Sequence, residues 1–138
     1  MLLDLGFKWV SSKYPAHATG KPQEEPSAEV YADIVRAQGS AQPYVYDNGL
    51  VEIPMSPISD VGAFRTNYWK LDWFLKAIRL AVESVIDKGQ VFDFLAHPSC
   101  LVVEDPKMAS LKLICHLAKE AGDKAELVGL DKVYERFA

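Results

Sequence analysis

The sequence contains little cysteine and no excess of basic residues. Of its 138 residues only Cys100 and Cys115 are cysteines, and 15 Lys and Arg stand against 19 Asp and Glu, which gives a net charge of -4. Two widely spaced cysteines exclude a disulfide framework and a CxxC metal knuckle. An acidic chain without a basic stripe is also a poor candidate for binding DNA or RNA. We therefore expect two reduced, structural cysteines and no nucleic-acid partner.

Long apolar runs and targeting signals are also missing. The N-terminal segment has no basic region ahead of its apolar residues and contains Asp4, which a signal peptide would not place there. No apolar run approaches the ~20 residues that span a bilayer, because the longest helical pattern contains Lys76, Arg79 and Glu83. We expect a cytoplasmic protein without membrane contact, built as one domain over residues 1–138.

Strand-like and helix-like segments alternate along the chain. The strand-like segments are residues 7–12, the two runs that flank Asn48-Gly49, residues 91–96 and residues 125–130. Helices are expected from the N-cap Ser27 to Gly39, from Leu71 to Gly89, from Asp105-Pro106 to Gly122, and from the cap Asp131 to Phe137. The Asn48-Gly49 pair favours a tight hairpin. This alternation is typical of βα units, so we predict an α/β fold with a mostly parallel sheet or a barrel.

His97 is the first candidate for chemistry. It directly follows the strand-like segment 91–96, and Pro98 prevents that strand from continuing. Ligands of parallel α/β proteins gather at the carboxyl ends of strands, and a histidine there can act as a general acid or a metal ligand. The alternative is a histidine that only hydrogen-bonds to the backbone.

A second candidate group follows the strand that ends at Pro54. Asp60 could orient a histidine or bind a substrate hydroxyl, or it could simply cap the turn before Gly62. Arg65 lies in the same loop and is a candidate for substrate binding. Ser12, which follows the first strand, is a further substrate-binding candidate, although a plain turn is the alternative there.

The aromatic and histidine residues elsewhere have two interpretations. Trp69 and Trp73, one helical turn apart, could face a sugar ring, or they could pack against a neighbouring helix or subunit. His17 and His116 are expected at the surface. The sequence has no GxSxG elbow, no glycine-rich phosphate loop and no HExxH pair, so a serine triad is unsupported.

Three stretches in order, LLDLGFKWVSSKYP, GLVEIPMSPISD and VFDFLAHPSCL, resemble the C-terminal half of the polysaccharide deacetylase (NodB homology) family. That family includes carbohydrate esterases that remove acetyl groups from chitin, peptidoglycan or xylan, and allantoinase-like relatives. The resemblance covers the chain from Leu2 to about Phe137. It implies a partial, irregular (β/α) barrel, with His97 as general acid toward the leaving group and Asp60 lining the site.

The metal-binding motifs of that family do not occur in this sequence. These motifs are T-F-D-D-G, which supplies the base and a metal-binding aspartate, and H-x-x-x-H, which supplies two histidine ligands. Zinc catalysis needs three protein ligands and an open position for water. We therefore expect no metal ligand in this chain, and zinc only together with the family's N-terminal half. Three explanations are open: a reading frame that starts at an internal methionine, a truncated gene, or a fragment that has acquired another role.

Two functions follow from these observations. The first is the C-terminal portion of a deacetylase-like hydrolase of C–N bonds, inactive as this isolated chain, with a carbohydrate or a small amide as ligand. The second is a non-catalytic binding or assembly module. Because half a barrel leaves strand edges open, we also expect a homodimer. Its interface would involve Tyr44, Val45, Val51, Ile53 or the Trp69/Trp73 helix end.

Overall fold

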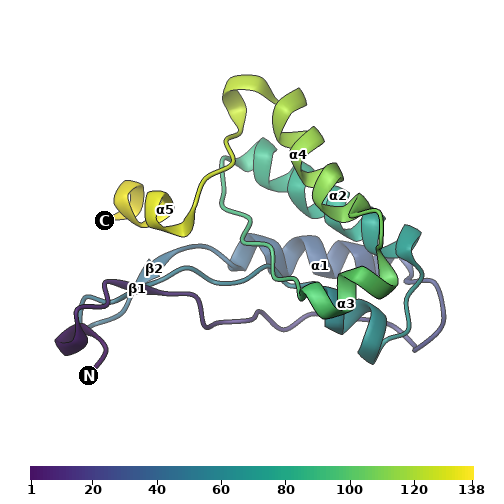
Figure 1. The fold of residues 1–138 in the computed structure, drawn as a ribbon, viewed down its shortest axis with the longest axis horizontal. Helices are drawn as coiled ribbons and strands as arrows, with labels where there is room; N and C mark the ends of the chain where they lie inside the picture. Colours follow the sequence, from purple (N-terminus) through teal and green to yellow (C-terminus); the bar gives the residue numbers. More distant parts are fainter.

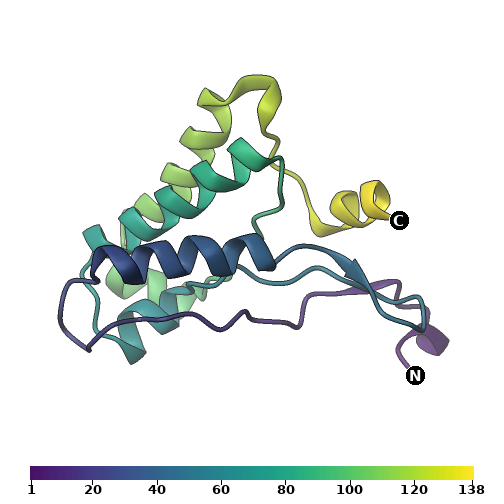
Figure 2. The ribbon, with the colours of Figure 1, turned by 180° about the vertical axis from the view of Figure 1, so that it is seen from behind.

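The computed structural model describes all residues, Met1–Ala138, as five α-helices, three short strands and three short helical turns (Figures 1 and 2). The helices are α1 (Ala28–Ser40), α2 (Leu71–Lys88), α3 (Pro98–Glu104), α4 (Ala109–Glu120) and α5 (Leu130–Phe137). The strands are β1 (Trp9–Val10), β2 (Tyr44–Val45) and β3 (Val51–Glu52). The turns are η1 (Leu3–Leu5), the π-helical η2 (Val61–Thr66) and η3 (Gly122–Lys124). A mixed α/β protein is confirmed, whereas a barrel is not shown.

The core is built around α2, which packs against α1 on one side and α4 on the other (Figure 1). Its apolar residues recur at spacings of three and four, so they form one stripe. Phe74 and Ile78 in this stripe are completely buried, as is Ile34 of α1. The edge of one ring meets the face of the other where Phe64 packs on Phe74, with centroids 4.9 Å apart. As predicted, the helix ends at Gly89, which takes a left-handed φ of 63°.

The three strands form one small sheet in the order β1-β3-β2. β1 is parallel to β3, and β2 pairs antiparallel with β3 through the predicted hairpin at Asn48-Gly49. Gly49 has a φ of 90°, which suits a glycine. Val51 and Ile53 are buried within the chain, so they cannot form the dimer interface that the sequence suggested.

Two predicted strands are wrong. Residues 91–96 and 125–130 are not strands in the structure. A strand needs a neighbour with free backbone groups. The segment 91–96 has one backbone hydrogen bond to the loop that follows β3, from the Ser56 amide to the Asp93 carbonyl at 2.8 Å. The backbone of Val91 binds the side chains of Gln38 and Gln42 instead of a strand.

Helix boundaries also differ in three places. α1 continues past Gly39 to Ser40. α5 begins at Leu130 after the N-cap Gly129, so Asp131 is not the cap that the sequence predicted. The helix expected from Asp105-Pro106 begins only at Ala109, as α4, and the sequence did not predict α3 before it. The cause is the Asp105 carboxylate, which accepts hydrogen bonds from the amides of Ala109 and Ser110 and therefore caps a later start.

α5 lies apart from the helical core, beside the strand end of the molecule, and has no buried residue (Figures 1 and 2). None of the helices combines the length and the apolar composition needed to cross a lipid bilayer.

We predict that Asp105→Ala lowers the free energy of unfolding by about 2–3 kcal/mol, because it removes a cap and leaves two amides and the Ser110 hydroxyl without their acceptor. Urea denaturation followed by circular dichroism measures this change. Asp123→Ala, at an exposed position, is the control and should stay within about 0.5 kcal/mol of wild type. Equal effects of the two substitutions would contradict the capping role.

Candidate functional site

Asp60 and His97, the two residues proposed as catalytic, lie side by side although 37 residues separate them. The His97 ring nitrogen Nδ1 is 2.7 Å from Asp60 Oδ1, and the His97 backbone amide donates to Asp60 Oδ2 at 2.6 Å. The Val61 amide also donates to Oδ1, at 2.8 Å. The carboxylate therefore has three donors. Both alternatives for Asp60 hold, since it orients a histidine and caps a turn.

Local structure explains how the two side chains meet. Asp60 ends the loop that follows β3 and is the N-cap of η2. His97 ends the extended segment 91–96 and is the N-cap of α3, where Pro98 occupies the first helical position. Each residue thus stands where an extended segment turns into a helix. Because both residues lie at helix starts, the carboxylate and the imidazole are held within hydrogen-bonding distance.

The environments of the two groups differ in a way that suits proton transfer. Asp60 is completely buried, whereas the His97 side chain is 45% exposed. An ionised carboxylate can only accept hydrogen bonds, so Nδ1 of a neutral His97 carries the proton and Nε2 is the basic nitrogen. Nε2 has no protein partner and can exchange a proton with a bound molecule. This arrangement provides an oriented general acid or base.

Arg65 and Glu104 lie at the rim of this site. The half-exposed Arg65 is 3.7 Å from the Glu104 carboxylate, and its positive charge acts on the thiol of Cys100. Burial raises the pKa of Cys100, the negative charge of Asp60 raises it further, and the contact with Arg65 offsets only part of this rise. Cys100 is therefore a buried thiol rather than a nucleophile. Arg65 remains a substrate-binding candidate.

Ser12 belongs to a different cluster, centred on Glu52. Its amide and hydroxyl donate to the Glu52 carboxylate at 2.7 Å each, and the Lys13 amide and the Tyr46 hydroxyl donate to it as well. Burial raises the pKa of Glu52, but these hydrogen bonds outweigh burial and hold it below its ordinary value. Ser12 makes no hydrogen bond to Asp60 or His97. Its contacts indicate a structural role.

The structure favours packing for Trp69. Its side chain is only 4% exposed and joins the core beside Tyr31, with ring centroids 6.4 Å apart. It precedes α2 rather than beginning it. A buried ring cannot stack on a sugar, so Trp69 does not serve as a substrate platform in this conformation. Trp73 is partly buried against the same core, with Lys70 above its ring.

Sequence reasoning missed Tyr14 as a neighbour of the site. Its hydroxyl accepts a hydrogen bond from the Ser59 amide at 3.2 Å, next to Asp60, and its side chain is partly exposed. No local signal marks this residue, because the contact joins loops 45 positions apart.

The residues present do not fit the zinc site of the resembled family. No group of three or more His, Cys, Asp or Glu side chains is arranged to hold a metal ion. His97 contacts one carboxylate, the His17 ring bonds to the Ala18 carbonyl, and His116 is exposed on α4. No step of the chemistry can therefore be assigned to a metal held by this chain.

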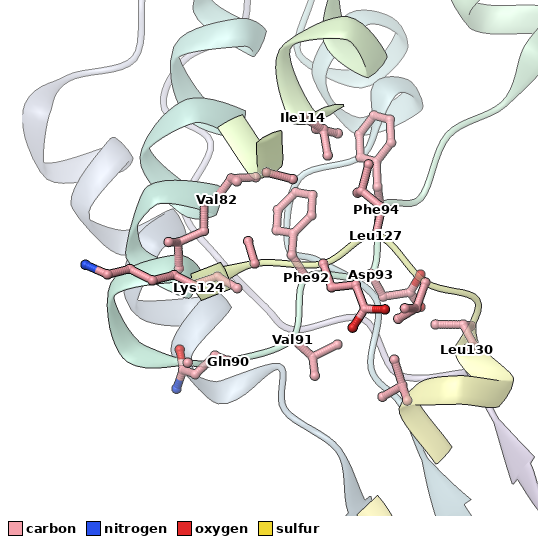
Figure 3. Close-up of a pocket in the computed structure, with 18 of the residues that line it drawn as sticks. Val82, Gln90, Val91, Phe92, Asp93, Phe94, Ile114, Lys124, Leu127 and Leu130 are labelled. Carbon is pink, nitrogen blue, oxygen red and sulfur yellow. The ribbon is translucent and has the colours of Figure 1, made fainter. Parts of the chain in front are cut away.

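An apolar cavity of about 530 Å³ lies beside the site rather than at it (Figure 3). Its walls come from α2, α4, residues 90–94 and residues 124–133, and they include neither Asp60 nor His97. The rings of Phe92 and Phe94 stack on one wall. Burial raises the pKa of Asp93 on the same wall, and the hydrogen bond from the Ser11 hydroxyl lowers that pKa in part.

Comparison of the chain with protein-family models, with curated proteins and with solved structures finds no match in any of the three.

We predict stability losses of different size for the two members of the pair. Asp60→Ala should lower the free energy of unfolding by about 2–4 kcal/mol, since it leaves two backbone amides and the ring without their acceptor. His97→Ala should cost less than about 1 kcal/mol, because the exposed ring adds little core area. Thermal and urea unfolding test both. A large loss of stability in His97→Ala would indicate a structural histidine.

The Glu52 cluster predicts a dependence of stability on pH. The pKa of Glu52 is lower in the folded chain than its ordinary value of 4.5, so the stabilisation is complete above that value and is lost as the pH falls through the folded pKa. The stability advantage of wild type over Glu52→Gln should therefore shrink between about pH 6 and pH 3. Glu120→Gln, at an exposed position on α4, is the control and should follow wild type throughout.

Proposed function

We propose that the Asp60–His97 pair is the acid–base element of a hydrolase that cleaves C–N bonds, as in the polysaccharide deacetylases that the sequence resembles. His97 Nε2 delivers a proton to the leaving nitrogen. Asp60 holds the ring and stabilises the imidazolium that exists before the proton is given up. Arg65 is positioned at the rim to contact a polar group of the substrate.

One observation carries this proposal. A fully buried carboxylate binds the inner nitrogen of a half-exposed imidazole, while the outer nitrogen has no protein partner. This leaves the outer nitrogen available to a bound molecule. The order of the resembled motifs supports the same assignment, because it matches the acid histidine of the family to His97.

The wider proposal is that the chain forms the C-terminal part of a (β/α) barrel. β1 and β3 are parallel and are joined through α1, and β3 leads through α2 to the extended segment 91–96, which is the order of βα units. In this proposal the base and the metal ligands come from residues that this sequence does not contain. The isolated chain therefore binds substrate without turning it over.

Nuclear magnetic resonance of the three histidine rings tests this function. The N-acetylglucosamine tetramer or N-methylacetamide should shift the His97 ring signals saturably, while His17 and His116 serve as internal references. The glucosamine tetramer, which lacks the acetyl group, is the matched control and should have a smaller effect. Asp60→Asn should weaken the response because the ring loses its orientation.

The same samples provide the contrary outcomes. Acetate release by the isolated chain, together with stoichiometric zinc that survives dialysis, would show that our assignment of an inactive chain is wrong. Signals of His97 that respond to none of these amides would overturn the substrate class. Equal responses to acetylated and deacetylated tetramers would point to a carbohydrate-binding module instead.

A further inference from the structure

A groove of about 730 Å³ runs along β1 next to α5. One wall is the continuous stretch of residues 6–12, and the other consists of Asp131, Tyr134 and Glu135 of α5. Successive side chains of a strand point to opposite faces of a sheet, so a groove over one face would touch only alternate residues. All seven residues from 6 to 12 line this groove and no residue of β2 or β3 does. It therefore follows the outer edge of β1.

The Trp9 backbone is free to pair along this edge, whereas the Phe7 amide donates to the Leu2 carbonyl at 3.1 Å. The Val51 amide donates to the Lys8 carbonyl at 3.1 Å and the Ile53 amide to the Val10 carbonyl at 2.8 Å. Because hydrogen-bonding directions alternate along a strand, the amide and carbonyl of Trp9 point away from β3. An unpaired edge of this kind is a template for another strand.

The opposite edge of the sheet is less suited to pairing. β2 is directly preceded by Pro43. Proline has no amide hydrogen to donate, and such residues protect edge strands from pairing. Tyr44 and Val45 are exposed there, but their edge offers fewer donors than β1 does.

The surface area of the chain exceeds that of a compact monomer of the same mass. The chain exposes 8117 Å². A compact monomer of 15.4 kDa exposes about 7,200 Å². The excess of about 900 Å² is close to the share of about 800 Å² that one partner contributes to a standard interface.

We propose that β1 pairs antiparallel with β1 of a second copy of this chain, about a two-fold axis near Trp9. Phe7, which is 53% exposed at this edge, is then covered. Charge complementarity favours a second copy as the occupant, because Lys8 and Asp131 both line the groove and neither forms an ion pair within the chain. Pairing brings Lys8 of one copy toward Asp131 of the other.

Sedimentation equilibrium at micromolar concentration tests the proposal. Wild type should sediment at twice the chain mass of 15.4 kDa. Phe7→Lys, which puts a charged group in place of the apolar side chain that pairing covers, should raise the dimer dissociation constant at least about tenfold. Val45→Lys is the matched control, because Val45 is also 53% exposed but lies on the opposite edge, and it should leave the dimer intact.

Two further measurements separate this interface from others. Amide exchange at Trp9 should be slow at concentrations where the dimer forms and fast on dilution. Lys8→Glu should weaken the dimer, and adding Asp131→Lys to it should restore part of the loss.

A folded monomer at about 100 µM overturns the proposal, as does dissociation by Val45→Lys with no effect of Phe7→Lys. Fast Trp9 exchange in a dimer would overturn the β1 pairing.

Discussion

The buried carboxylate of Asp60 is the interaction on which both the site and this part of the fold depend. It joins the start of η2 to the start of α3 through two backbone amides, and the same oxygens hold the His97 ring. A fully buried charge is stable only when its acceptor positions are filled. The donors that stabilise Asp60 are therefore also the contacts that orient the imidazole. Fold and candidate chemistry share one set of hydrogen bonds.

Elements with strong local signals could be predicted from the sequence. Ser27 caps α1, Gly89 ends α2, and Asn48-Gly49 forms the hairpin, because each depends on residues within one turn of the chain. The strands at 91–96 and 125–130 could not be predicted in the same way. Their apolar, β-prone composition suits a strand, but a strand also needs a neighbouring strand to pair with. At Val91 the side chain of Gln42 binds both the backbone amide and the carbonyl instead.

The residues of the candidate site also differ in how well the sequence could predict them. Asp60 and His97 could be selected because both follow extended segments, where side chains gather in α/β proteins. Ser12 satisfied the same rule, yet its hydroxyl is taken by Glu52. Trp69 was a surface candidate because one helical turn separates it from Trp73, but tertiary packing buried it. Position along the chain indicates where a site can lie, and burial decides which side chains remain available.

Buried carboxylates replace sheet hydrogen bonds throughout this molecule. Glu52, Asp60 and Asp105 are each completely buried, and each accepts two backbone amides from loops or helix ends. Four of these six amides lie at helix starts, where the backbone has no intrahelical carbonyl to bind. The third ligand distinguishes their roles. Glu52 and Asp105 add only hydroxyl groups, whereas Asp60 adds the imidazole of His97. The proton transfer that we propose is therefore confined to Asp60, because only there is the last partner a ring with a second, free nitrogen.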